Sequence, residues 1–96
     1  MPAFAVTYSY ADGTAASRDQ HRPSHIQFLQ SQFDRGLLAK SGPFAPEEAP
    51  GALLIINGES KADVEAVMDQ DPFFQNNLIE ERSIRQWNIF FGADEK

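Results

Sequence analysis

The chain has 96 residues and no cysteine. This absence excludes a disulfide framework, a thiolate-bound metal and a cysteine nucleophile, and it fits a reducing compartment. The chain also lacks any run of about 18 apolar residues, which excludes a membrane-spanning helix. Its first six residues show neither the basic start nor the long apolar stretch of a secretory signal. Together these absences predict a cytoplasmic protein.

Basic residues are also scarce. Eight Lys and Arg stand against 14 Asp and Glu, which gives a formal net charge of −6 and an isoelectric point near 4.7. Such acidity works against binding to a nucleic-acid backbone, which relies on clustered Lys and Arg. The sequence contains no phosphate-binding loop and no dinucleotide fingerprint, so no cofactor is expected.

Hydrophobic residues, by contrast, are plentiful. They make up 42% of the chain and include eight phenylalanines. A chain of this length forms a single domain, residues 1–96, with one modest core. The many phenylalanines indicate a compact aromatic core or an apolar pocket.

The hydrophobic pattern alternates between the strand type and the helix type. Strands are indicated by alternating heavy and light residues or by a short continuous apolar run, and helices by a stripe at three- and four-residue spacing. The expected elements are a strand over 3–10, a helix from 17 or 23 to 35, a short strand over 37–41, a strand over 52–56, a helix from 61 to about 70 and a strand over 82–91.

The ends of the helices carry recognisable signals. Pro23 is tolerated in a first helical turn, so the regular part of the first helix could begin there, with Ile26, Leu29 and Phe33 as its buried stripe. The capping-box pattern from Ser60 to Asp63 starts the second helix. Asp71-Pro72 interrupts that helix and could begin a further turn. The charged tail 93–96 is expected to be frayed.

The order strand, helix, strand, strand, helix, strand predicts a ferredoxin-like βαββαβ fold of the α+β class. In this fold a four-stranded antiparallel sheet carries both helices on one face. We expect Tyr and Phe side chains to point from the other face, which then needs a cover. A second subunit laid face to face would supply it, so the sequence predicts a homodimer in the form of a dimeric α+β barrel.

His25 and Asp71 are the main candidates for chemistry. Each is a titratable side chain at the edge of a predicted apolar helix face, where burial alone is costly and a partner of opposite charge lowers the cost. If the fold brings them together, they form a His–carboxylate pair suited to proton transfer near neutral pH. His25 would be the general base or acid, and Asp71 would orient it.

Four segments of the chain resemble the YCII-related domain family. They are Arg22-x-x-His25-x-x-Phe28-Leu29, Gly36 to Ser41-Gly42-Pro43, Asp71-Pro72-Phe73 and Ile84-Arg85-Gln86-Trp87. The resemblance implies a dimeric ferredoxin-like fold close to muconolactone isomerase-type domains, with a His–Asp pair in a small pocket. Members with an assigned reaction act on small cyclic or aromatic metabolites by elimination or isomerisation. Pro23 and the acidic loop 45–50 depart from the usual pattern.

Further residues are candidates for the wall and mouth of this pocket. Ser41, Gly42 and Pro43 could offer a hydroxyl and a backbone donor, Arg22 could bind an anionic substrate, and an apolar wall could come from Phe28, Phe44, Phe73 and Trp87. Each has a structural alternative. Ser41 to Pro43 could be a plain turn, Arg22 a surface ion pair, Trp87 part of a dimer interface, and the phenylalanines part of the core.

Two functions remain open at this point. One is a small cofactor-independent enzyme that uses His25 and Asp71 in acid/base elimination or isomerisation of a small cyclic or aromatic metabolite. The other is a non-catalytic dimeric module that binds a small ligand or a protein partner, with His25 bonded to Asp71 for structure and Asp71 capping a turn. No metal is expected: His21 and His25 have a ligand spacing, but Pro23 lies between them.

Overall fold

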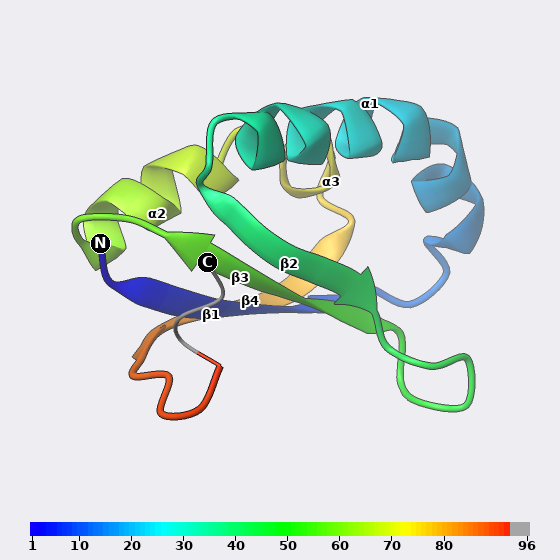
Figure 1. Cartoon of the computed structure of the whole chain (residues 1–96). Helices are drawn as coiled ribbons and strands as arrows, with labels where there is room; N and C mark the ends of the chain where they lie inside the picture. The colour runs from blue at the N-terminus through cyan, green and yellow to red at the C-terminus, as the bar shows by residue number, and fades with distance from the viewer. Residues whose placement is uncertain (93–96) are drawn as a thin grey trace.

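The computed structural model of the protein describes residues 1–92. The expected frayed tail over residues 93–96 lies outside this described part of the chain. The elements, labelled in Figure 1, are β1 (Ala3–Tyr10), α1 (Ala15–Asp34), β2 (Leu38–Pro43), β3 (Gly51–Asn57), α2 (Lys61–Met68), α3 (Pro72–Gln75) and β4 (Ile79–Trp87).

The four strands form one antiparallel sheet in the order β2-β3-β1-β4. Figure 1 shows the helices on one face of this sheet. This is the ferredoxin-like α+β arrangement, so the prediction made from the order of the elements is confirmed. The further turn expected after Asp71 is the short helix α3, which begins at Pro72.

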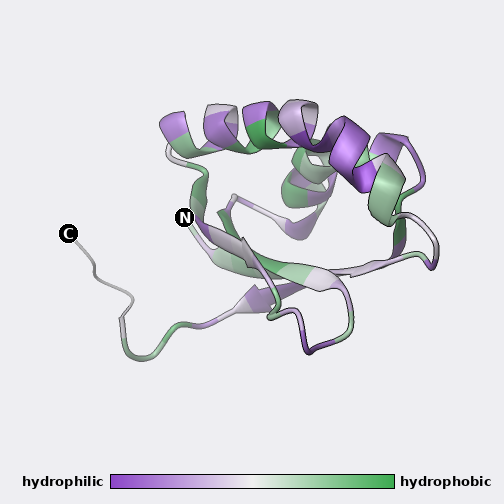
Figure 2. Cartoon of the chain, turned by 90° about the vertical axis from the view of Figure 1, so that its right-hand side faces the viewer, coloured by the Kyte–Doolittle hydropathy of each residue, from purple (hydrophilic) through white to green (hydrophobic). Residues whose placement is uncertain are grey.

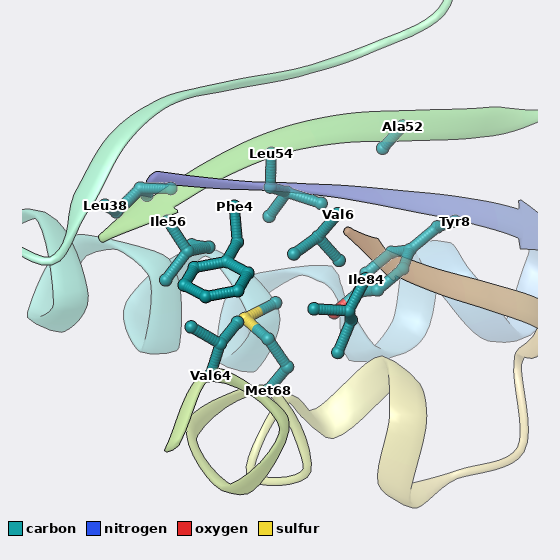
Figure 3. Close-up of a cluster of buried hydrophobic side chains, with 10 residues drawn as sticks. All are labelled: Phe4, Val6, Tyr8, Leu38, Ala52, Leu54, Ile56, Val64, Met68 and Ile84. Atoms are coloured by element: carbon teal, nitrogen blue, oxygen red, sulfur yellow. The ribbon is translucent and has the colours of Figure 1, made fainter. Parts of the chain in front are cut away.

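The core lies between the sheet and the helices. Phe4, Val6 and Tyr8 of β1 are each at most 2% exposed, and they pack with side chains from the neighbouring strands. Figure 3 shows this cluster, with Val64 and Met68 of α2 closing it from the helix side. Burial of each large apolar side chain contributes about 1.5–3 kcal/mol to stability, so this layer fixes the position of α2.

Helix α1 begins earlier than expected, at Ala15, so that Pro23 lies inside it. An interior proline removes one backbone hydrogen bond and crowds the preceding turn. The first turn is held by other contacts, because the Thr14 hydroxyl accepts a hydrogen bond from Arg18 and the Arg18 guanidinium lies 4.4 Å from the centre of the Tyr10 ring. These contacts help to offset the cost of Pro23.

The predicted buried stripe of α1 is wrong in two of its three residues. Ile26 and Phe33 are 52% and 56% exposed, whereas His25 and Gln32 are buried and Leu29 is partly buried against the core. One residue corresponds to a rotation of about 100° around a helix. Figure 2 shows that hydrophilic residues make up much of the ribbon of α1.

The last strand also differs from the prediction. It spans 79–87 instead of 82–91, because β4 lies at the edge of the described sheet beside β1, and Trp87 pairs with Ala3, the first residue of β1. Beyond that residue β4 has no neighbour to pair with. The chain therefore leaves the sheet, and Phe90 and Phe91 are 89% and 88% exposed.

The open face of the sheet carries fewer aromatic rings than predicted. Phe4, Val6 and Tyr8 point toward the helices, and the β1 residues that alternate with them are Ala5 and Thr7. Only Trp87 supplies a ring to this face from the strands. In the part of the chain that the structure describes, every helix is too short or too polar to span a bilayer.

Candidate active site

Asp71 is placed by the junction between α2 and α3. It is the N-cap of α3, and its Oδ1 atom accepts a hydrogen bond from the backbone N–H of Phe73 at 3.0 Å. Pro72 follows at the first helical position, where its missing N–H costs nothing. Although a carboxylate is expensive to bury, the Asp71 side chain is fully buried, so its other oxygen lone pairs need donors as well.

His25 of α1 supplies one of these donors. Its Nδ1 atom lies 2.8 Å from Asp71 Oδ1, and both side chains are buried. The Phe73 ring stacks on the imidazole with a centroid distance of 3.9 Å and an interplanar angle of 1°. The structure therefore brings the two main candidates together and holds the imidazole in one plane.

Tyr8 of β1 is a further partner that the sequence did not indicate. Its hydroxyl donates to Asp71 Oδ2 at 2.7 Å, across 63 residues of chain. Burial, and then the nearby Asp71 carboxylate, raise the pKa of Tyr8, so Tyr8 remains a neutral donor at neutral pH. Strand alternation gives no sign of such a partner, because the contact is set by the packing of α3 against β1.

These contacts determine which nitrogen of His25 is available. Asp71 accepts hydrogen bonds from Tyr8 and Phe73, and as an acceptor it favours the tautomer of His25 with the proton on Nδ1. The Nε2 atom then carries the lone pair. Among the described residues none forms a hydrogen bond with Nε2, which leaves this atom for a ligand. The arrangement can accept a proton at Nε2 and stabilise the resulting imidazolium through Asp71.

A cavity of about 440 Å³ lies beside His25. Five of the candidate pocket residues line it together with His25, namely Arg22, Ser41, Gly42, Pro43 and Phe73. Ser41 to Pro43 reach it from β2, an edge strand, and are not the turn that the sequence suggested. An edge position also explains why Pro43, which has no N–H, is tolerated. The lining residues that the sequence did not indicate are Tyr10, Ile26, Leu29, Ala52 and Leu54.

Three of the predicted wall residues lie elsewhere. Phe28 packs against the hydrophobic core, and Trp87 is 46% exposed at the end of β4. Trp87 and Phe44 line a separate hollow of about 700 Å³, which also includes Leu53 and Ile55 of β3. Leu53 and Ile55 alternate with the core residues of β3, so this hollow lies on the open face of the sheet, away from His25. Phe28, Phe44 and Trp87 are therefore corrected: none of them lines the His25 cavity.

One arginine of α1, Arg22, lines the cavity, and a second, Arg18, contacts the lining residue Tyr10. Arg22 lies one helical turn before His25 and forms an ion pair with Asp19, in which both side chains are substantially exposed. Arg18 lies over Tyr10, whose ring packs edge-on against Phe73 at 5.8 Å. Burial raises the pKa of Tyr10, so this ring is also neutral at ordinary pH.

A metal centre has no support in this geometry. Within residues 1–92, no group of three or more His, Asp or Glu side chains is arranged to hold a metal ion. His21 does not join His25 in the cavity lining.

Comparison with known families gives one match over most of the chain. The family model of the YCII-related domain matches residues 3–88. Among curated proteins, none matches the sequence. The family match covers every element from β1 to β4 and both residues of the His25–Asp71 pair.

Several solved structures have a similar fold. One is 5-chloro-2-hydroxyhydroquinone dehydrochlorinase from Burkholderia phenoliruptrix in complex with 2,5-dihydroxybenzoquinone, which is 19% identical, with a TM-score of 0.80 over 96% of this chain and 99% of that one. A NIPSNAP family protein of unknown function from Agrobacterium tumefaciens is 18% identical, with a TM-score of 0.55 over 96% and 92%. An antibiotic biosynthesis monooxygenase is 9% identical, with a TM-score of 0.58 over 94% and 99%. At these identities the likeness concerns the fold.

Proposed function

The chain belongs to the YCII-related domain family, and we propose that it is a small cofactor-independent enzyme. Its reaction would be an acid/base elimination or isomerisation of a small cyclic or aromatic metabolite, with His25 as the proton-transfer residue and Asp71 as its partner. The homodimeric state and the cytoplasmic location predicted from the sequence belong to the same proposal.

One observation carries this proposal. The fully buried Asp71 carboxylate binds Nδ1 of His25, and His25 lines a cavity. Burying the Asp71 carboxylate is costly. In this position it holds the His25 ring through Nδ1, so that Nε2 is available to a ligand in the cavity. A positioned general base of this kind contributes about 10²–10⁴-fold to the rate of a proton transfer.

In an elimination, Nε2 of His25 would take a proton from a C–H or O–H group of the substrate. The electron pair left behind would form a new double bond, and the leaving group would depart with the electrons of its own bond. In an isomerisation, the imidazolium would return the proton to a different atom of the same substrate. Asp71 would stabilise the imidazolium in both cases.

The similar dehydrochlorinase supports the elimination form of the proposal. Its name describes loss of hydrogen chloride from a chlorinated hydroquinone, and its bound ligand is a quinone ring. The cavity of about 440 Å³ in this chain is large enough for a single ring, and its wall includes Phe73, Leu29 and Leu54.

Proton transfer can be tested without knowing the natural substrate. Candidate hydroxyquinones and unsaturated lactones are incubated with the protein in D₂O, and loss of C–H signals is followed by ¹H NMR. Chloride release from 5-chloro-2-hydroxyhydroquinone is measured in parallel. We expect activity in the wild type and a loss of at least about 100-fold in His25→Gln. Equal rates in the two proteins would contradict the proposal.

The alternative is a non-catalytic binding module with the same pocket, and it is separated by comparing ligand binding with proton exchange. In the enzyme, replacing Asp71 by Asn removes the carboxylate that would stabilise the imidazolium, so deuterium exchange should slow while the folded variant still binds the ligand. An unchanged exchange rate in folded Asp71→Asn would mean that the pair takes no part in proton transfer. Binding without any deuterium exchange or chloride release would favour the module.

The homodimer has its own support in the open face of the sheet. Leu53 and Trp87 are 39% and 46% exposed there, on the side opposite the helices. A second subunit laid on this face would remove both from water. Analytical ultracentrifugation at micromolar concentration should give twice the chain mass of 10.7 kDa. A stable monomer would contradict this part of the proposal.

A further inference from the structure

Arg22 is the one formally charged residue in the described lining of the His25 cavity, and the Asp71 carboxylate lies behind His25, outside that lining. The chain as a whole carries 14 acidic and 8 basic residues. Of the described residues that line the cavity, however, none is Asp or Glu, and the formal charge comes from Arg22.

Other lining residues make the cavity suitable for a flat ring. Phe73 forms one side and is held by stacking on His25 and by an edge contact with Tyr10. Leu29 and Leu54 add aliphatic wall. Such a surface binds an apolar ring and leaves the orientation of the ring to a few polar groups.

Arg22 and His25 are three residues apart on α1, so their side chains lie on the same face of the helix. Three residues correspond to a rise of about 4.5 Å. An anionic oxygen held by Arg22 and an atom exchanging a proton with His25 could therefore be carried on opposite sides of one six-membered ring.

The ion pair between Arg22 and Asp19 does not prevent Arg22 from binding an anionic oxygen of a ligand. Arg22 forms an ion pair with Asp19, and the two side chains are 47% and 73% exposed. Exposed ion pairs of this kind contribute little to stability, because water screens them. A carboxylate or enolate of a ligand can replace Asp19 with little loss.

From these observations we infer that the substrate class is a single-ring compound carrying an anionic oxygen, with Arg22 as the residue that selects the charge. This inference rests on the proposed function and makes it more specific. Arg22 touches the substrate but takes no part in the proton transfer.

The test uses benzoate and benzamide, which share a ring and differ in charge. Their binding to ¹⁵N-labelled protein is measured from amide shifts, including those of Phe73 and Ser41. We expect benzoate to bind about tenfold more tightly than benzamide, since a charge-assisted hydrogen bond contributes about a factor of ten or more. Arg22→Gln should remove this preference. Acetate, an anion without a ring, should bind more weakly than benzoate.

Arg35→Gln is the matched control. It removes the same charge from the other end of α1, where Arg35 follows the last helical residue and does not line the cavity. We expect Arg35→Gln to keep the preference for benzoate. Equal binding of benzoate and benzamide, binding of acetate as tight as that of benzoate, or retention of the preference in folded Arg22→Gln would overturn the inference.

The outcomes separate this inference from the proposed function. Anion-selective binding that depends on Arg22, without deuterium exchange on any candidate, would overturn the enzyme and support the charge selection. Exchange on candidate rings that depends on His25, without preference for an anion, would support the enzyme and overturn the charge selection.

Discussion

The Asp71 carboxylate has two structural roles and one proposed chemical role. It caps α3 through the backbone of Phe73, and it holds the side chains of Tyr8 and His25. Each of these groups is buried, so each would lose the hydrogen-bond partner that it has among the described residues if the carboxylate were removed. A buried polar group without a partner costs about 1–3 kcal/mol.

Asp71→Ala is therefore expected to lower the free energy of unfolding by about 3 kcal/mol or more, measured by urea denaturation. Asp34→Ala is the control, because Asp34 only accepts an exposed hydrogen bond from Gln30 on the same helix. Its effect should stay within about 0.5 kcal/mol. Equal losses of unfolding free energy in the two variants would mean that the buried hydrogen bonds of Asp71 stabilise the fold no more than an exposed hydrogen bond does.

The raised pKa of Tyr8 predicts that the free energy of unfolding falls at alkaline pH. Burial raises its pKa in the folded state, so its contribution is complete below the unfolded pKa of about 10 and is lost as the pH rises above that value. Above pH 10 the free energy of unfolding should decrease by up to about 1.4 kcal/mol per pH unit for this residue. Urea denaturation between pH 8 and 11 measures the decrease.

Tyr8→Phe serves as the comparison in that series. It should cost about 1 kcal/mol at neutral pH, because one hydrogen bond is lost, and it should reduce the alkaline slope. The smaller slope that remains is expected to include Tyr10, the second of the two tyrosines, whose pKa is also raised by burial. Identical slopes in wild type and Tyr8→Phe would refute the assignment.

At the scale of residues, the sequence predicted the meeting of His25 and Asp71 but not that of Asp71 with Tyr8. The first two stood out because a titratable group beside an apolar stripe needs a partner. Tyr8 looked like an ordinary strand aromatic, and its hydroxyl finds Asp71 only after β1 and α3 have packed. Phe28 and Trp87 were predicted to line the cavity, but neither does. The type of a side chain does not reveal which face of its helix or strand borders a cavity.

Among the elements, α1 was the least predictable. Ile26, Leu29 and Phe33 form a regular apolar stripe, yet the helix turns His25 and Gln32 toward the sheet. Periodicity assumes that apolar burial decides the orientation of a helix. Here the buried hydrogen bond between His25 and Asp71 favours the observed orientation over the one that apolar burial alone would favour. In contrast, the apolar run at 52–56 lies within β3, where burial does dominate.

The pairing of β1 with β3 depends on a glycine. A Cβ atom added at Gly51 would lie 2.2 Å from the Tyr8 carbonyl oxygen, which is backbone and cannot move aside, and 3.2 Å from the Phe44 ring. Gly51→Ala should therefore cost about 1–3 kcal/mol. Gly42→Ala in the neighbouring strand, where nothing lies within 4 Å, should be nearly neutral in the same denaturation experiment. Similar losses would argue against close packing at Gly51.

For the whole molecule, the proposed dimer can be tested by a substitution on the open face of the sheet. Leu53→Glu would place a carboxylate in the centre of the subunit interface and is expected to give monomers in ultracentrifugation, with an unchanged circular dichroism spectrum. Phe33→Glu adds the same charge to the 56% exposed side chain on α1 and should leave the dimer intact. A dimeric Leu53→Glu would place the interface elsewhere.

The overall topology could be predicted from the sequence, because the order of strands and helices is that of the ferredoxin-like fold and connection rules leave few arrangements. The ends of the elements could not. Strand β4 stops at Trp87 because β1 begins at Ala3, and α1 starts before Pro23 because Thr14 and Arg18 hold its first turn. Both limits come from contacts between segments far apart in the chain or from side chains outside the repeating pattern.

The inner face of α1 has a consequence for folding specificity. A helix rotated by one residue would bury Ile26 and Phe33 and gain apolar area, but it would withdraw His25 and leave the Asp71 carboxylate without it. The proton-transfer pair thus penalises the competing rotation that the hydrophobic pattern would otherwise favour. A variant in which leucine replaced both His25 and Asp71 would lose more than proton transfer. Its sequence would no longer encode a single orientation of α1.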